Sequence, residues 1–453
     1  MKIIHVPYGF YPDSVGGTEV YVSALAREQI DLGHVAIVTA PGPHEDEYEH
    51  DSVPVRRFAA TSQIDDVSQL YDEGDRTAAQ GFARILDREQ PDVVHLHAFT
   101  RACSVLLVRE ARARGIPVVF TYHTPTVSCA RGTLMLWGAT PCDGALGVAR
   151  CAACALEAHG MARPLANLLG HIPPSRALAS ARIKGRAATA LKFSSLVAME
   201  HSATRALFDE VDRIVAFRGW VRALLVGNGV AESKIVSSSH ALCHPFTVRP
   251  RAARHSPTLR VAFMGRIDPT KGVDVLIRAL GMMPSADIVL DIYGTVQGEG
   301  GRRELERLRR LADGDRRVTF KTPVDGSVVI GTIAAYDVLA VPSQWMETGP
   351  LVVLEAFAAG VPVVGSALGG IGELVSDDVD GLLVSDFQSP RAWANAFTRL
   401  CNEPRLADTL CDGVRPPATM DRVASEMLGL YDTMIAPSAR LATRPKLSNL
   451  APV

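Results

Sequence analysis

Two glutamates, Glu347 and Glu355, are separated by seven residues and could together hold a polyhydroxylated anionic ligand. Gly349, Pro350 and Leu351 lie between them, and a proline at this point favours the first turn of a helix. The free backbone N–H groups of a first helical turn bind anions well. A diphosphate could bind this helix start, with one carboxylate holding ribose hydroxyls and the other holding a sugar.

Two cations, Arg266 and Lys271, occur in the segment from Gly265 to Gly272, between an apolar run and a helical pattern. Arginine can contact a phosphate with two parallel hydrogen bonds, and lysine acts as a point charge. The pair could therefore neutralise a diphosphate. The alternative is a solvated basic turn. The position at the end of a predicted strand favours the binding site.

A glycine pair, Gly16-Gly17, falls between the first apolar run and the first helical pattern. Glycine lets the backbone approach a ligand closely, and the following helix start favours an anion. A tight turn without a ligand is the alternative reading of such a pair, so this motif gains weight only in combination with the others.

Short apolar runs alternate with helical patterns along most of the chain. The runs are continuous rather than alternating, which indicates strands covered on both faces, as in a parallel sheet. The sequence therefore predicts an α/β fold with two Rossmann-like, doubly wound domains that face a central cleft. The predicted strands are 2–6, 35–39, 92–96, 117–121, 211–216, 259–264, 288–292, 318–320, 338–341 and 361–364.

The alternation of strand and helix patterns, and the places where it is interrupted, indicate where the domains begin and end. We expect an N-terminal acceptor-side domain over 1–246, with a Cys-rich and basic insertion at about 125–205. A Pro/Arg-rich linker over 247–256 precedes a nucleotide-sugar-binding domain over 257–412. A C-terminal helix at 413–436 could return to the first domain, and the tail 437–453 is expected to lack folded structure.

Composition excludes several classes of protein. The 453 residues carry a net charge of −2, so no overall basic excess indicates nucleic acid. The first residues read as a strand and not as a secretory signal, and the most apolar region, 351–375, contains Glu355, Pro362 and several glycines. We therefore expect a cytoplasmic protein, with peripheral contact at the inner face of a membrane as an option.

Four of the eight cysteines fall within 26 residues, which suggests a structural metal site. The pair Cys151 and Cys154 has the two-residue spacing found in zinc sites. Glycines and prolines around the cysteines predict a loop with little core of its own, which a tetrahedral zinc could order. Four unlinked thiols are the alternative. The proposed ligands are Cys129, Cys142, Cys151 and Cys154, with His159 as a substitute.

A basic stretch at 160–205 contains leucines beside its cations, and Glu200 is its only acidic residue. Such a stretch could touch an anionic membrane surface, and a solvated helical face is an equally good interpretation. Its cations are Arg163, Arg176, Arg182, Lys184, Arg186, Lys192 and Arg205, and its apolar residues include Leu165, Leu168, Leu169 and Ile172.

As an ordered set, these motifs resemble glycosyltransferase family 4, retaining enzymes with the B-type two-domain fold. The matching segments are YPDSVGGTEVY, PDVVHLHAF, VVFTYHT, DRIVAFRGWVRALLVGNGV, VAFMGRIDPTKGVDVLIRAL and ETGPLVVLEAFAAGVPVVGSALGGIGEL. The insertion and the segment from His240 to Pro245 depart from the family pattern, and both fall where acceptors can bind.

The resemblance implies a role for each matching residue. Gly16 and Gly17 would cover the donor phosphates, and Arg266 and Lys271 would clamp the diphosphate. Glu355 would hold the ribose, and Glu347 would contact the transferred sugar. His123, in the segment TYHT, would be the active-site histidine near that sugar. A buried histidine bonded to the backbone is the alternative for His123.

The expected activity is therefore transfer of a sugar from a nucleoside diphosphate sugar to an unidentified glycan or lipid-linked acceptor. The resemblance implies retention at the anomeric carbon, and no cofactor is required if two cations neutralise the diphosphate. A nucleotide-sugar epimerase of the same fold and a non-catalytic nucleotide-sugar-binding subunit are the alternatives.

Overall fold

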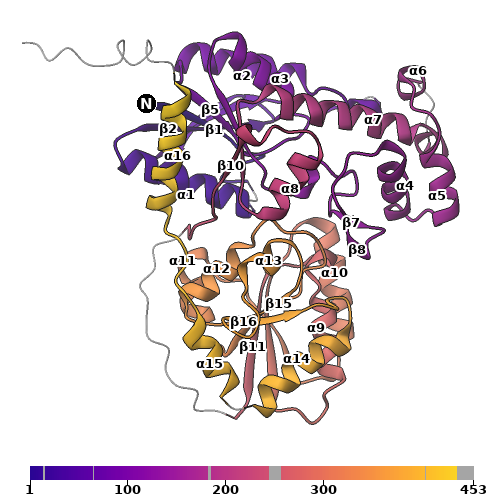
Figure 1. The fold of residues 1–453 in the computed structure, drawn as a ribbon, viewed down its shortest axis with the longest axis vertical. Coiled ribbons are helices and arrows are strands. Elements are labelled where there is room, and N and C mark those ends of the chain that lie inside the picture. Colours follow the sequence, from indigo (N-terminus) through magenta and orange to yellow (C-terminus); the bar gives the residue numbers. More distant parts are fainter. Residues whose placement is uncertain (14–15, 65, 182–184, 244–256, 404, 436–453) are drawn as a thin grey trace, which may run out of the picture.

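The computed structural model describes residues 1–453 except 14–15, 65, 182–184, 244–256, 404 and 436–453. Two α/β domains are stacked along the long axis of the molecule (Figure 1). The predicted linker 247–256 and tail 437–453 lie outside the described residues, as do Ser14 and Val15 of the glycine-rich turn.

The N-terminal domain is built on an eight-stranded sheet whose central strands β1, β5 and β6 are buried. All neighbouring strands are parallel except β3 and β4. In spatial order the strands are β10 (Ile235–Ser237), β9 (Arg213–Ala216), β6 (Val118–Thr121), β5 (Val93–Leu96), β1 (Lys2–Val6), β2 (Val35–Gly42), β4 (Val53–Ala59) and β3 (Asp46–His50). Continuous apolar runs form the central strands because helices cover both faces of the sheet.

Helices and short 3₁₀ turns connect these strands. Asp75 caps one of them, since its carboxylate accepts hydrogen bonds from the N–H groups of Thr77 and Ala78. The connecting elements are α1 (Gly17–Asp31), η1 (Val67–Leu70), α2 (Arg76–Glu89), α3 (Val105–Ala113), η2 (Pro125–Val127), α8 (Gly219–Gly227) and η3 (Glu232–Lys234).

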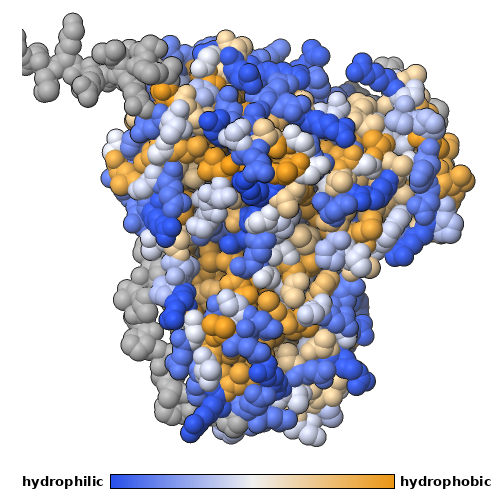
Figure 2. Space-filling model, viewed as in Figure 1, coloured by the Kyte–Doolittle hydropathy of each residue, from blue (hydrophilic) through white to orange (hydrophobic). Residues whose placement is uncertain are grey.

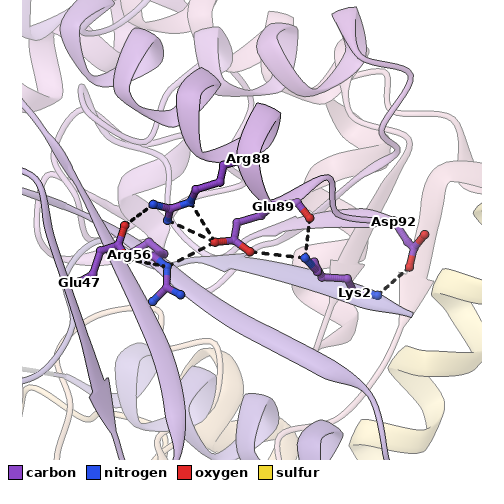
Figure 3. Close-up of polar contacts among 6 residues, drawn as sticks. All are labelled: Lys2, Glu47, Arg56, Arg88, Glu89 and Asp92. Atoms are coloured by element: carbon purple, nitrogen blue, oxygen red, sulfur yellow. Dashed lines mark hydrogen bonds and ion pairs between the residues drawn. The ribbon is translucent and has the colours of Figure 1, made fainter. Parts of the chain in front are cut away.

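Charged residues fasten α2 to the sheet (Figure 3). The Lys2 ammonium donates to the Glu89 backbone oxygen at 2.7 Å, and Arg56 Nε lies 3.3 Å from Glu89 Oε1. The Asp92 carboxylate accepts from the Lys2 backbone N–H at 2.6 Å, and Arg88 pairs with Glu47 of β3. Ion pairs that keep part of their hydration contribute at most about 1 kcal/mol each, so these contacts mainly fix the position of α2 against β1, β4 and β3.

The C-terminal domain contains a six-stranded sheet in which every neighbouring pair is parallel. In spatial order the strands are β13 (Val318–Lys321), β12 (Ile288–Thr295), β11 (Leu259–Arg266), β14 (Val338–Val341), β15 (Val363–Ser366) and β16 (Gly381–Val384). Around them lie η4 (Pro269–Lys271), α9 (Val273–Gly281), α10 (Gly298–Leu311), α11 (Gly326–Ile333), α12 (Leu351–Ala358), α13 (Gly369–Leu374), α14 (Pro390–Asn402) and α15 (Leu406–Gly413).

The last described helix, α16 (Met420–Met434), packs against α1 of the N-terminal domain (Figure 1). Met427 and Tyr431 of α16 join Leu25 of α1 in one buried cluster. The two chain segments that pass between the domains touch each other, because the Leu242 N–H donates to the Ala418 backbone oxygen at 3.1 Å. Leu242 and Thr419 form an isolated bridge at that point.

The insertion is a helical lobe at one side of the N-terminal domain (Figure 1). Its elements are β7 (Met135–Leu136), β8 (Thr140–Pro141), α4 (Val148–Ala158), α5 (Arg163–Gly170), α6 (Arg176–Ala179) and α7 (Arg186–Glu210). The expectation that the Cys-rich segment is a loop with little core of its own is wrong at α4, which carries Cys151 and Cys154. Leu156, Phe193, Leu196 and Val197 form a small apolar core between these helices.

One cation of the predicted basic stretch is internal. Lys192 on α7 is 1% exposed, and its ammonium donates to the Ala181 backbone oxygen at 2.8 Å and lies 3.6 Å from the Asp66 carboxylate. Lys192 is therefore unavailable to a surface, in contrast to the sequence-based expectation. Arg182 and Lys184 lie outside the described residues. No helix within the described ranges combines the length and apolar character needed to cross a membrane.

Candidate active site

Glu347 lies in the loop between β14 and α12, where 6% of the residue is exposed. Its Oε1 accepts a hydrogen bond from the Lys271 ammonium at 2.8 Å and another from the Ser343 hydroxyl. Lys271 also lies 5.6 Å from the centre of the Trp345 ring, a cation–π distance. The structure thus brings together Glu347 and Lys271, which are 76 residues apart in the sequence.

Glycines allow the Glu347 loop to pack closely against its neighbours. The Gly370 N–H donates to the Glu347 backbone oxygen at 2.6 Å, and a Cβ at Gly370 would lie 2.7 Å from that oxygen. Gly272, with φ +67°, would place a Cβ 2.1 Å from the Pro342 backbone oxygen. Larger side chains at either position would displace the loop that carries Glu347.

The same loop contacts the N-terminal domain. The Thr348 hydroxyl donates to the His123 backbone oxygen at 2.6 Å, and Arg218 Nε donates to the Thr348 backbone oxygen at 3.2 Å. A Cβ at Gly349, where φ is +155°, would lie 2.6 Å from Nδ1 of His240. Thr348 therefore ties the loop that carries Glu347 to the backbone of His123, across the domain boundary.

The glycine-rich turn faces the start of α12. Gly16 is the N-cap of α1, and its N–H donates to Glu19 Oε2 at 2.8 Å. A Cβ at Gly17 would lie 3.6 Å from Cδ1 of Leu351, the first residue of α12. Pro350 is the N-cap of α12, so the starts of the two helices meet here.

Glu355 lies one turn into α12 and is partly exposed. Burial raises the pKa of its carboxyl to about 7, because the charged form loses hydration. The carboxyl therefore changes its charge near neutral pH. Cys243 of the N-terminal domain is close enough for Glu355 to raise the pKa of its thiol, although burial is the larger cause.

Arg266 is exposed at the end of β11 and lines a cavity of about 520 Å³. Arg303, Arg307 and Arg310 of α10 line the same cavity. Arg307 is already paired with Glu304 at 2.7 Å and with Asp274 at 3.4 Å. The cavity is of a size that binds small molecules, and its cations favour an anion.

His123 follows β6 and is 7% exposed. Burial lowers the pKa of its ring to about 3, so the ring is neutral at pH 7. Its Nε2 lies 3.0 Å from Nδ1 of His97. His97 is hydrogen-bonded in turn to His5, and His5 to Gln29. Sequence reasoning missed these three residues and also Thr348 and Arg218. The available signal was two histidines, His95 and His97, in the otherwise apolar run VVHLH.

The four cysteines of the insertion do not converge on one point. Cys151 and Cys154 lie on helix α4 and not in a turn. Burial raises the pKa of the Cys142 and Cys151 thiols, and Cys129 lies near enough to both to add to the increase. The Cys154 sulfur instead accepts a hydrogen bond from the Trp137 N–H at 3.3 Å. His159 caps the end of α4.

Solved structures with the same architecture are glycosyltransferases of the B-type fold. The chain is similar to sucrose-phosphate synthase from Thermosynechococcus elongatus, with a TM-score of 0.64, 20% identity, and coverage of 96% of this chain and 99% of that chain. It is also similar to Anabaena Alr3699/HepE in complex with UDP and glucose, with a TM-score of 0.59, 16% identity, and coverage of 98% and 100%. The two Rossmann-like domains confirm the predicted fold.

Two family models match the sequence. Residues 248–412 match the model described as glycosyl transferases group 1, and residues 15–166 match that of glycosyltransferase family 4. The chain therefore belongs to the family 4, group 1 glycosyltransferases, as the sequence motifs predicted.

Curated relatives match part of the chain. The D-inositol 3-phosphate glycosyltransferase of Salinispora arenicola is 36% identical over 203 residues, which cover 42% of this chain and 44% of that protein. The same-named protein of Mycolicibacterium smegmatis is 34% identical over 186 residues, 40% of this chain and 39% of that protein. The chain thus spans less than half the length of these relatives.

Proposed function

We propose that the protein transfers a sugar from a nucleoside diphosphate sugar to an acceptor hydroxyl, with retention at the anomeric carbon. The observation that supports this proposal most directly is the Lys271–Glu347 ion pair. The loop that carries Glu347 is bonded to the N-terminal domain through the Thr348 hydroxyl and the His123 backbone oxygen. A carboxylate paired with a cation thus lies on a loop that is bonded to the backbone of a residue with a neutral imidazole, at the domain boundary. Family membership supports the same reaction.

In this proposal, Arg266, Lys271 and the start of α12 stabilise the charge that develops on the departing diphosphate. The bond between the anomeric carbon and the diphosphate oxygen breaks, and the acceptor oxygen bonds to the same face of that carbon. The acceptor proton passes to the leaving phosphate. Glu347 is already bonded to Lys271 and Ser343, so we assign it to sugar binding and not to nucleophilic attack.

A panel of nucleoside diphosphate sugars tests the activity. We expect slow hydrolysis of one donor by the purified protein, and faster release of the nucleoside diphosphate when an acceptor is added. D-inositol 3-phosphate is a reasonable first acceptor because relatives carry its name. Formation of an epimeric nucleotide sugar would instead support an epimerase. Donor binding without turnover, across a broad acceptor panel, would support a binding subunit.

Donor affinity is expected to fall on acidification through pH 7 because of Glu355. An ionised carboxylate accepts hydrogen bonds from two ribose hydroxyls, and the protonated form loses this charge-assisted bonding. We therefore expect the Kd for the donor to be about tenfold higher at pH 6 than at pH 8. The pKa of about 7 places the change in this window. Isothermal titration with a nucleoside monophosphate analogue lacking a titrating phosphate would measure it.

The matched variant is Glu355→Gln, which keeps the shape of the side chain and cannot ionise. Its donor affinity should be weaker at pH 8 and should show no step between pH 6 and pH 8. An identical pH profile in the variant and the wild type would exclude Glu355 as the ribose ligand.

A structural zinc in the insertion remains a prediction. Its first three ligands would be Cys129, Cys142 and Cys151, since Cys129 and Cys142 lie near enough to act on the Cys151 thiol, and Cys154 would join them only by giving up its hydrogen bond to the Trp137 N–H. Metal analysis of protein purified without chelator should find about one zinc per chain. Cys151→Ala should lose it, and Cys411→Ala, in the other domain, should keep it. No zinc, with all four thiols titratable in the folded protein, would exclude the site.

We also propose that the helical lobe contacts an anionic membrane. Leu165 and Leu168 on α5 are 48% and 69% exposed, and Arg163 at the start of α5 is exposed as well. Arg176, Arg186 and Arg205 are the other exposed cations of the lobe within the described ranges, and Arg205 also donates to the Leu146 backbone oxygen. Figure 2 shows apolar and hydrophilic residues mixed on the surface of this lobe. Each cation near such a surface contributes about 1 kcal/mol.

Co-sedimentation with liposomes containing anionic lipid should show binding that disappears at high salt. The double variant Leu165→Ser, Leu168→Ser should reduce binding at least about fivefold, since it removes two apolar side chains from the contact. Val328→Ser is the control, because Val328 is 51% exposed on the C-terminal domain. Equal binding by both variants would contradict the proposed surface.

A further inference from the structure

Four buried side chains form a continuous hydrogen-bonded row that ends at His123. Gln29 Oε1 lies 2.8 Å from His5 Nε2, and His5 Nδ1 lies 3.0 Å from His97 Nε2. His97 Nδ1 in turn lies 3.0 Å from His123 Nε2. Gln29 comes from α1, His5 from β1, and the other two histidines follow β5 and β6. The row therefore connects the interior of the N-terminal domain to the candidate site.

The rings in this row are neutral at pH 7. Burial lowers the pKa of His5 to about 4 and that of His123 to about 3. The pKa of His97 is also well below its ordinary value, mainly through burial and then through the neighbouring histidines. A neutral imidazole has one N–H donor and one acceptor nitrogen. Each ring must therefore donate at one end and accept at the other.

The position of the proton on one ring then determines its position on every other ring of the row. The Gln29 carbonyl oxygen only accepts, so His5 carries its proton on Nε2 and accepts at Nδ1. His97 consequently donates from Nε2 and accepts at Nδ1, and His123 donates from Nε2. Within the described part of the chain, Nδ1 is the nitrogen of His123 that this row does not use.

We propose that Gln29 is a positioning residue that fixes the tautomer of His123, so that His123 presents an unprotonated Nδ1 to a hydroxyl of the donor sugar. The contact between His123 and the sugar rests on the proposed function, whereas the tautomer of His123 does not. Gln29 acts over a distance through His5 and His97, and it is not expected to touch the substrate.

The same cluster could be mistaken for a metal centre. His5, His95 and His97 have ligand nitrogens that all lie within 4.8 Å of one another. However, each of these rings has partners at both nitrogens: His95 bonds to Tyr431 at 2.6 Å and to Thr121 at 2.7 Å. The three rings are fully buried, and a divalent cation without a carboxylate ligand would be costly there. The hydrogen-bonded row explains the arrangement without a metal.

Nitrogen-15 NMR of histidine-labelled protein tests the proposal without any substrate. The full chain is measured at pH 7.5, and a His123→Asn variant assigns the His123 ring signals. We expect the proton of His123 on Nε2 and not on Nδ1. A proton on Nδ1 in the wild type would overturn the proposal by itself, even if no variant folds.

The variant Gln29→Met has a similar shape and offers no carbonyl acceptor to His5. We expect it to shift His123 to a mixture of tautomers. Thr39→Val is the matched control, because Thr39 is fully buried on neighbouring β2 and its hydroxyl has no partner among the described residues. Its His123 signals should match the wild type. An unchanged tautomer in Gln29→Met would also overturn the proposal.

The kinetic consequence separates this proposal from the proposed function. If the protein transfers sugar, Gln29→Met should lower kcat/KM about tenfold, the effect of one misdirected hydrogen bond. An unchanged kcat/KM alongside a shifted tautomer would remove the sugar contact from the proposal. Absence of transfer in the wild type, with the expected NMR signature, would contradict the proposed function and leave the positioning role of Gln29 intact.

Discussion

Replacing Arg266 by alanine is expected to lower kcat/KM for the donor by about 30- to 1000-fold, which corresponds to about 2–4 kcal/mol of lost charge-assisted contact. Arg266 is exposed beside the basic cavity at the end of β11, so its removal leaves no buried group without a partner. The free energy of unfolding should therefore stay within about 0.5 kcal/mol of the wild type. Steady-state kinetics and urea unfolding provide the two measurements.

Lys271→Ala provides an informative comparison. The Lys271 ammonium is the cationic partner of the buried Glu347 carboxylate, so this variant should lose stability, by about 3 kcal/mol or more, as well as activity. Arg278→Ala is the control, because Arg278 is exposed on α9 of the same domain. Wild-type kinetics in the Arg266→Ala, Lys271→Ala double variant would contradict the diphosphate assignment.

Stability is expected to fall steeply as the pH drops below 6.5. Burial lowers the pKa of six histidines, which are His5, His95, His97, His123, His201 and His240. Their unfolded forms bind protons below pH 6.5 while the folded forms do not. Their contribution to stability is therefore complete above pH 6.5 and is lost below it, at about 1.4 kcal/mol per pH unit for each histidine.

Two carboxyl groups act in the opposite direction. Burial raises the pKa of Glu200 and Glu355 to about 7, so both bind protons more tightly when folded. Their stabilising effect grows as the pH falls from 7 toward 4.5. Six histidines minus two carboxyl groups leaves a net uptake of about four protons on unfolding, or about 5 kcal/mol per pH unit near pH 5.5. Domains have total stabilities of about 5–15 kcal/mol, so we expect acid unfolding near pH 5.

Urea unfolding at several pH values between 5 and 7.5 measures how steeply the free energy of unfolding changes with pH. His201→Asn should reduce the slope by about 1.4 kcal/mol per pH unit, because one buried ring is removed. His44→Asn changes an exposed residue and should leave the slope as it is. A slope no steeper than that of one histidine would contradict the prediction.

The fold could be predicted because its central strands are apolar on both faces. Continuous apolar runs such as KIIHV and VVFT bury side chains on both faces of the strand, which indicates the middle of a sheet that helices cover on both sides. The β3–β4 hairpin was not predicted, since Asp46–His50 is acidic and exposed and pairs with its neighbour only at the sheet edge. The Cys-rich part of the insertion was read as a loop because glycines precede α4, while alanines form much of the core between the helices.

The candidate site was only partly predictable. Arg266 and Lys271 could be placed because they follow a strand, and Glu347 because it precedes a helix start. The contacts that join the domains have no local pattern: Thr348 and His123 are 225 residues apart, and Arg218 and Thr348 are 130 apart. Buried histidines in neighbouring strands also carry no fixed spacing. Only the parallel sheet brings His5, His97 and His123 into one row.

The paired segments at Leu242 and Thr419 limit how the two domains can move. The chain leaves the N-terminal domain near Leu242 and re-enters it near Thr419, and the two segments are hydrogen-bonded to each other at the crossing. Two connections at one place act as a single pivot. A movement that preserves this bond must be a rotation about an axis through the crossing, and it cannot be a sliding of one domain along the other. Opening by such a rotation would separate Thr348 from His123. The histidine row would remain assembled, because Gln29, His5, His97 and His123 all belong to the N-terminal domain.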